Sequence, residues 1–94
     1  MPAFETWILL LQAARASEPR DPAFSENCLR KALKSAEEIQ GEQSAEAGLC
    51  LAELAVFLKR NGKSDEAESL SQRYREIFRA YTRDGLSGGI YSGS

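Results

Sequence analysis

The sequence predicts an all-α protein whose four helices form two antiparallel helical hairpins. Three observations support this fold class. Helix breakers are nearly absent from the interior, because there are only three prolines and four of the seven glycines lie in the last ten residues. Apolar residues recur at steps of three and four in successive segments, which is the spacing of helices with one buried face. The pattern of the first half of the chain also recurs in the second half.

The first predicted helix covers residues 2–17. Pro2 suits the first helical position, and Glu5 lies where a negative charge favours the helix dipole. The expected buried stripe is Phe4, Trp7, Leu10, Leu11 and Ala14. The segment EPRDP, residues 18–22, ends this helix, and its last two residues begin the next one.

The second predicted helix begins with Asp21 as its N-cap and Pro22 as its first helical residue. Its expected stripe is Phe24, Cys28, Leu29, Ala32, Leu33, Ala36 and Ile39. Gly41 ends this helix, because glycine readily adopts the backbone conformation that follows a helix.

Ser44 is the expected cap of the third helix, which ends at Arg60. Its stripe is Ala47, Leu51, Leu54, Ala55 and Leu58. Lys59 and Arg60 complement the negative end of the helix dipole, and Asn61 with Gly62 supplies a left-handed C-cap.

Ser64 is the expected cap of the fourth helix, with Asp65 and Glu66 in its first turn. Its stripe is Ala67, Leu70, Tyr74, Ile77, Phe78 and Tyr81. The helix is expected to fade at residues 82–84, and the Gly/Ser-rich residues 85–94 form a flexible tail. Because the connections are only two to five residues long, consecutive helices should run antiparallel.

The composition excludes several function classes. A net charge of −2 gives no reason to expect nucleic acid as a partner, since the phosphate backbone selects concentrated Lys and Arg. The sequence has no histidine, so the commonest general base and metal ligand are missing. The candidate acids Glu37, Glu38, Glu42, Glu46 and Glu53 lie on helical segments and are interpreted as solubilising charge. We therefore expect neither an enzyme nor a bound cofactor or metal.

The sequence also bears on membrane association and on cellular location. No segment approaches the roughly 20 apolar residues that span a bilayer. The short apolar run Trp7–Leu11 lacks the basic start of a signal peptide. The two cysteines, Cys28 and Cys50, should lie on neighbouring helices with an axial offset on the order of 9 Å, which is too far for a disulfide. Buried free thiols and a cytoplasmic location are the resulting expectations.

The chain matches itself when it is shifted by 42 residues. Residues 25–39 then lie over residues 67–81, with Cys28 over Leu70 and Ala32 over Tyr74. In the preceding helices, Trp7, Leu10, Leu11 and Ala14 have the spacing of Leu51, Leu54, Ala55 and Leu58. The repeating unit is thus a helix–turn–helix, and repeats of this length are typical of solenoids.

These residues resemble tetratricopeptide repeats (TPR), in particular the longer variety of about 42 residues typified by kinesin light chain. The positions that carry the resemblance are Leu51, Leu54, Ala55, Leu58, Gly62 and Ala67. It covers residues 24–78 well and residues 4–23 weakly. Leu58 replaces the usual aromatic residue, and Ser71 lies where a large residue is commoner.

The resemblance implies a short right-handed solenoid over residues 1–84, with hairpins at 3–41 and 44–83. It also implies a non-catalytic module that binds a peptide or partner helix on a concave face. The concave positions would be Glu5, Ile8, Gln12, Leu49, Ala52, Val56, Lys59 and Arg60. Of these, Lys59 and Arg60 are interpreted as either helix-end charges or a site for an acidic peptide. A plain four-helix bundle and burial of this face within the fold remain alternatives.

Two repeats are fewer than the three or so that usually form a stable stack. The first helix is also apolar on nearly all sides, so it requires cover from more than one direction. We therefore expect self-association as a homodimer through Trp7, Leu9 and Leu10. A purely structural oligomerisation domain with no other ligand is the alternative function.

Overall fold

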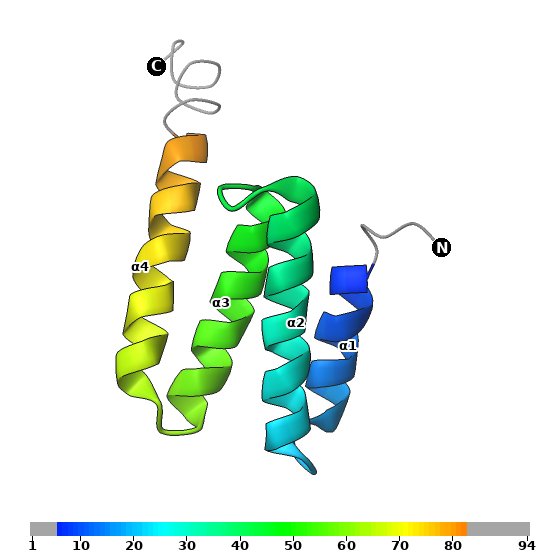
Figure 1. Cartoon of the computed structure of the whole chain (residues 1–94). Coiled ribbons are helices and arrows are strands. Elements are labelled where there is room, and N and C mark those ends of the chain that lie inside the picture. The colour runs from blue at the N-terminus through cyan, green and yellow to red at the C-terminus, as the bar shows by residue number, and fades with distance from the viewer. Residues whose placement is uncertain (1–5, 83–94) are drawn as a thin grey trace, which may run out of the picture.

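The computed structural model describes residues 6–82, and four helices account for nearly all of them (Figure 1). The helices are α1 (Thr6–Ser17), α2 (Pro22–Gln40), α3 (Ala45–Arg60) and α4 (Ser64–Tyr81). No strand occurs within residues 6–82, which confirms the all-α prediction for that part of the chain. The predicted helix start at residues 2–5, with Phe4 and Glu5, lies outside the described residues, as does the predicted tail at 85–94.

Side-chain caps begin α2 and α3 as the sequence predicts. The carboxylate of Asp21 accepts a hydrogen bond from the backbone N–H of Phe24 at 3.1 Å, and Pro22 is the first helical residue. The hydroxyl of Ser44 accepts one from the N–H of Ala47 at 3.0 Å. Each bond satisfies a donor that the first turn of the helix would otherwise leave unpaired.

The α3–α4 connection is tighter than the sequence suggests. Gly62 has a left-handed φ of 84°, as expected for this position. The N–H of Lys63 donates to the carbonyl of Leu58 at 2.8 Å, and the N–H of Gly62 donates to that of Lys59 at 3.3 Å, which together form a Schellman motif. Lys63 occupies the N-cap position of α4 and makes no side-chain capping hydrogen bond. The prediction that Ser64 is the N-cap was therefore wrong. Ser64 is the first helical residue instead.

The helices pack mainly with their neighbours in the chain (Figure 1). α1 packs on α2 and α3 packs on α4, while the α2–α3 contact joins these two pairs. α1 also makes a small contact with α3, but α1 and α4 are not among the packed pairs. The two pairs are therefore held together chiefly through α2 and α3.

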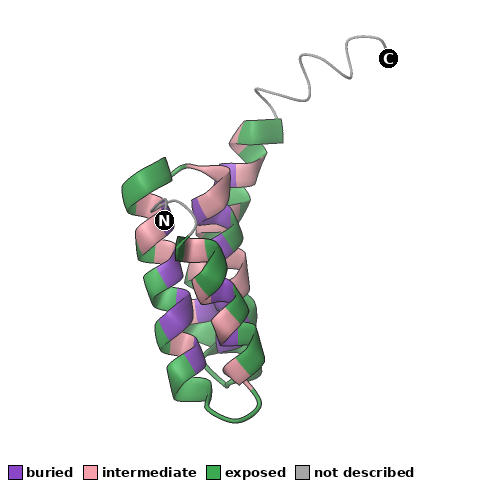
Figure 2. Ribbon diagram, turned by 90° about the vertical axis from the view of Figure 1, so that its right-hand side faces the viewer, coloured by how far each residue is buried: buried purple, intermediate pink, exposed green. Residues whose placement is uncertain are grey.

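The core lies along the facing sides of the helices, where buried residues alternate with exposed ones (Figure 2). Leu51, Leu54 and Leu58 of α3 are its largest fully buried side chains. Ala32 and Ala36 of α2 are also fully buried. Such small side chains let helices approach closely, and larger ones would overpack the contact. The predicted stripe of α3 is buried throughout, and Cys50 and Phe57 extend it.

Three aromatic or aliphatic residues of the predicted stripes are exposed instead. Phe24, Ile39 and Tyr81 lie in the first or last turns of their helices, and each is between 43% and 48% exposed. Tyr81 has a polar role, because its hydroxyl accepts a hydrogen bond from the N–H of Ala45 at 3.0 Å. Periodicity assigns a residue to a face, but it does not show where along the helix the cover ends.

Ser25 is a buried residue that periodicity did not identify. Its hydroxyl donates to the carbonyl of Ala14 at 2.7 Å and thereby connects α2 to α1. A buried hydroxyl without such a partner would destabilise the fold.

Ion pairs connect the helices in a second way, joining α1 to α3 and α2 to α4. The pairs between α1 and α3, including the turn after α1, are Arg15–Glu53 and Glu18–Arg60. Those between α2 and α4, including the turn before α4, are Glu26–Lys63, Arg30–Glu66 and Glu37–Arg73, each at 2.9 Å. Hydrogen bonds from Lys63 and then Arg30 lower the pKa of Glu26, so these contacts weaken as pH falls.

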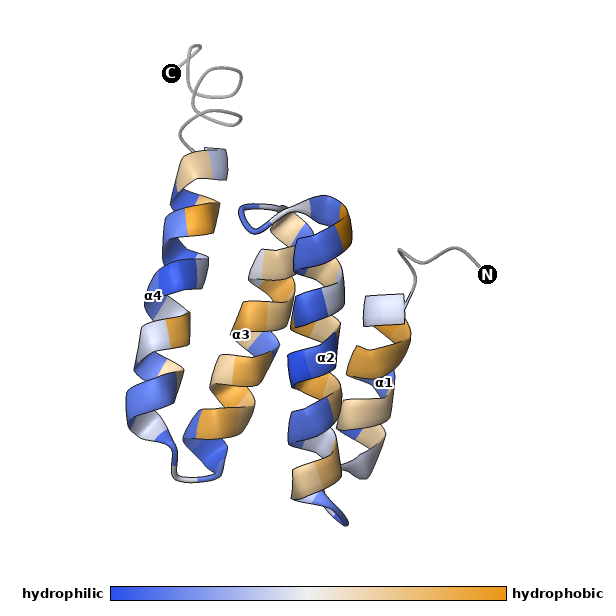
Figure 3. Cartoon of the chain, in the orientation of Figure 1, coloured by the Kyte–Doolittle hydropathy of each residue, from blue (hydrophilic) through white to orange (hydrophobic). Residues whose placement is uncertain are grey.

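Hydropathy follows the same pairing of helices, with α1 resembling α3 and α2 resembling α4. Figure 3 shows α1 and α3 as mostly apolar and α2 and α4 as mostly polar. α3 is covered by both α2 and α4.

Replacement of Leu54 by Ala should destabilise the fold by about 2–5 kcal/mol, because it removes a fully buried side chain and leaves a cavity. Chemical denaturation of Leu54→Ala measures this loss. Ile39→Ala, at an exposed position on α2, is the matched control and should change the free energy of unfolding by about 0.5 kcal/mol or less. Equal effects of the two substitutions would contradict the described core.

Both cysteines are free and buried, as the sequence predicts. Burial raises the pKa of the Cys50 thiol from 9.0 to about 12, and nearby carboxylates, with Glu53 first, add to the effect. The folded protein therefore holds this proton more tightly than the unfolded chain. The resulting stabilisation is fully present below about pH 9 and is lost as pH rises toward 12.

Cys50→Ala should consequently flatten the alkaline loss of stability. Urea midpoints measured from about pH 8 to pH 11 should fall more steeply for the wild-type chain than for Cys50→Ala. Leu54→Ala also opens a core cavity but retains the thiol, so it should keep the wild-type slope. Equal slopes for all three proteins would show that the thiol does not titrate on unfolding.

Candidate functional site

A row of apolar residues on α3 remains uncovered in the structure. Leu49 is 48% exposed and Val56 is 51% exposed, while Ala52 lies between them and is half-buried. Spacings of three and four place the three residues on one side of the helix. All three belong to the predicted partner-binding set, and the described part of the chain does not bury them as a core face would be buried.

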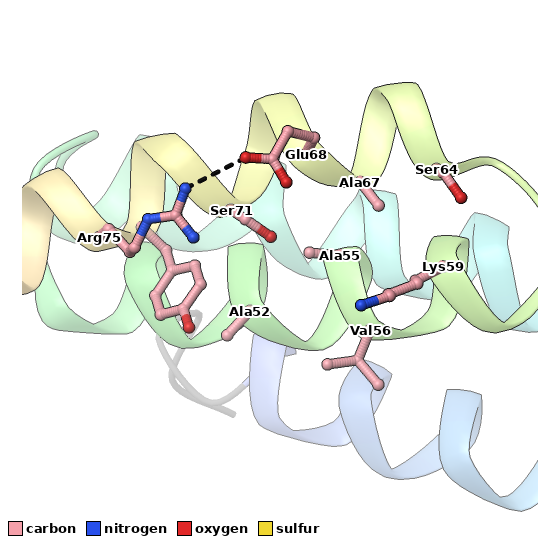
Figure 4. A pocket seen from close by; sticks show the side chains of 10 residues that line it. Ala52, Ala55, Val56, Lys59, Ser64, Ala67, Glu68, Ser71 and Arg75 are labelled. Atoms are coloured by element: carbon pink, nitrogen blue, oxygen red, sulfur yellow. Dashed lines mark hydrogen bonds and ion pairs between the residues drawn. The ribbon is translucent and has the colours of Figure 1, made fainter.

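Two members of this row also line a hollow between α3 and α4. Ala52, Val56 and Lys59 of α3 line it together with side chains of α4, and Figure 4 shows Val56 on the side of α3 that points away from α4. The hollow has a volume of about 320 Å³. Its other lining residues are Ala55, Ser64, Ala67, Glu68, Ser71, Tyr74 and Arg75. Most of these side chains are short, which leaves the space between the two helices unfilled.

Three charged side chains line the hollow, namely Lys59, Glu68 and Arg75. Glu68 and Arg75 form an ion pair on α4, with an oxygen–nitrogen distance of 3.3 Å (Figure 4). Both side chains are largely exposed, so this pair contributes little to stability. Lys59 forms no ion pair with any of residues 6–82. It is thus the charge in the hollow that is available to a ligand.

The other predicted partner-binding residues that the structure describes do not line this hollow. Ile8 and Gln12 are exposed on α1, and the ion pairs between α1 and α3 place these helices side by side. Arg60 is bound to Glu18, which raises the pKa of Arg60 through the hydrogen bond between them. Glu5 lies outside the described residues. The structure therefore brings together three predicted residues, Ala52, Val56 and Lys59, in one cavity.

The α4 side of the hollow was missed by the sequence-based prediction, which assigned the binding surface to the first helix of each hairpin. Ser64, Glu68, Ser71 and Arg75 all contribute to it. Ser71 was the available signal, because a small residue at a position that usually carries a large one leaves space.

The predicted oligomerisation residues differ in their exposure. Trp7 and Leu10 are half-buried and pack against the core cluster. Leu9 is 50% exposed and is the member of the set that is most available for contact with a second molecule. Ile8, next to it, is also exposed.

The lining limits what the hollow can hold. Short apolar side chains with one free cation can hold an apolar side chain and a carboxylate. No group of three or more potential metal ligands occurs among residues 6–82. Within the same residues, no helix combines the length and apolar character that a membrane crossing requires.

Comparisons with known proteins identified no relative of this chain. The chain matches no protein-family model, no curated protein and no solved structure.

Proposed function

We propose that this chain is a non-catalytic protein–protein interaction module that binds a peptide or helix at the α3–α4 hollow. The observation that carries the proposal is the exposed row of Leu49, Ala52 and Val56 beside an open cavity. Clustered apolar groups of this kind are usually covered by a partner. A polypeptide fits better than a small ligand, because the hollow opens onto the exposed apolar row, and an extended partner can cover both.

We further propose that the fold is a short TPR-like solenoid of two antiparallel hairpins. Tyr81 near the end of α4 meets Ala45 at the start of α3, as an antiparallel pair requires. The ion pairs between α1 and α3 and between α2 and α4 join residues 36 to 42 positions apart, close to the 42-residue repeat. A closed bundle would instead pack α1 on α4. The two buried free thiols suit a reducing compartment such as the cytoplasm.

The double variant Ala52→Glu with Val56→Lys should abolish capture of a protein partner from a lysate, because it places charges in the apolar row. Affinity capture followed by mass spectrometry measures this. The matched control is Asn27→Glu with Gln40→Lys, which makes the same charge changes at exposed positions on α2. Both variants should melt close to the wild-type temperature. Undiminished capture by a folded Ala52/Val56 variant would exclude the hollow as the site.

Self-association is a second candidate function, favoured by the exposure of Ile8 and Leu9 on α1. A symmetric homodimer would cover these residues on both copies. Light scattering after size exclusion should then give twice the monomer mass. Leu9→Glu should return the chain to a monomer without unfolding it, since Leu9 is not part of the core. A clean wild-type monomer at tens of micromolar would contradict self-association.

A further inference from the structure

The α3–α4 hollow resembles a groove that is already occupied within the same chain. On the basis of the proposed function, we infer that the hollow accepts one helix of a different protein. That helix carries an acidic residue and, four positions later, a large apolar residue. The acidic group pairs with Lys59, and the apolar side chain fills the space above Ser71.

The occupied groove lies between α1 and α2, one repeat earlier. There Ala14, Arg15 and Leu29 are met by Glu53 and Phe57 of α3. Arg15 forms an ion pair with Glu53, whose hydrogen bond raises the pKa of Arg15. Phe57 is only 2% exposed, and the space left among these residues is about 20 Å³. A helix with an acidic residue four positions before an aromatic one therefore fills this groove.

The repeat carries the two key positions of that groove into the hollow. Lys59 stands 44 positions after Arg15, and Ser71 stands 42 positions after Leu29. Both line the hollow, which has about 320 Å³ where the earlier groove retains about 20 Å³. The cation is thus conserved in kind between the two sites. The isobutyl side chain of Leu29 is replaced by the smaller hydroxymethyl group of Ser71, which makes room for a larger ligand side chain.

The burial pattern of the second helices agrees with a missing neighbour. α2 is covered on two sides, by α1 and α3, and buries Ser25, Leu29 and Ala32 among others. The equivalent residues of α4 are Ala67, Ser71 and Tyr74, of which only Ala67 is buried. α4 packs mainly on α3, so the side of α4 that corresponds to the α3-facing side of α2 is open.

A second copy of this chain does not supply the required residues in the register that the repeat implies. If its α1 entered the hollow as α3 enters the earlier groove, Leu9 would take the place of Glu53 and Ala13 that of Phe57. Lys59 would then face an apolar side chain, and the cavity would receive a methyl group. In the earlier groove, Lys63 forms an ion pair with Glu26. The repeat places Asp21 of the entering copy at the position of Lys63, and Glu68 at the position of Glu26, so two carboxylates would come close together. Like charges in proximity disfavour this arrangement.

The test uses the full chain and a fluorescein-labelled, alanine-based helical peptide with Glu at one position and Phe four positions later. Fluorescence anisotropy should show saturable binding. Replacement of the peptide Phe by Ala should abolish binding, because the cavity is then left empty. Lys59→Glu should weaken binding by about fivefold or more. A peptide with Lys in place of Glu should restore the affinity of that variant.

Two further substitutions locate the binding site. Ser71→Arg should block binding, because the long side chain occupies the cavity. Lys34→Glu reverses an exposed charge on α2 and should leave the affinity unchanged. Circular dichroism of each variant must match the wild type, so that a loss of binding reflects the hollow and not unfolding.

Four results would overturn the inference. The first is that the peptide does not bind, and the second is that Lys59→Glu leaves the peptide affinity unchanged. The third is that the wild-type chain is a dimer that Ser71→Arg converts to a monomer. The fourth is that truncation after Thr82 increases the affinity for the peptide. The third would assign the hollow to a second copy, and the fourth to residues 83–94 of the same chain. Loss of lysate capture in the Ala52/Val56 variant together with absence of peptide binding would retain the general interaction function and reject only this occupant.

Discussion

The packing of α2 against α3 is the contact on which the rest of the structure depends. It joins the α1–α2 pair to the α3–α4 pair. Within residues 6–82, the other connections between the two pairs are minor helix contacts, such as the small one between α1 and α3, and a set of ion pairs at the surface. Small buried residues of α2, such as Ala32 and Ala36, permit the close approach, and leucines of α3 supply the apolar area. Because exposed ion pairs stabilise a fold only weakly, this apolar contact must provide most of the connection.

Within residues 6–82, α2 packs on two helices and α4 packs mainly on one. α3 covers α2, but α4 packs mainly on α3, and this accounts for the hollow beside α4. Short side chains at Ala67 and Ser71 enlarge the opening. The surface with the best geometry for binding is therefore a direct consequence of how the helices stack, and it lies next to the exposed row that includes Val56.

Much of this fold was predictable from the chain alone, because helix ends and buried stripes are local properties. The caps at Asp21 and Ser44 and the left-handed Gly62 follow from the chemistry of those residues. The binding surface was predictable only in part. Val56 and Lys59 were identified, but their partners on α4 belong to a different helix, and their proximity depends on how α3 and α4 pack.

The sequence by itself determined the all-α class, the helix positions, the free state of the two thiols and the repeated pattern of the two halves, because each depends on spacing and residue chemistry along the chain. Only the tertiary structure decided that Arg60 binds Glu18 while Lys59 does not bind another charge among residues 6–82, and that the end-of-helix residues Phe24 and Tyr81 are exposed. These outcomes depend on which helix lies opposite each side chain, and local periodicity does not specify the neighbour.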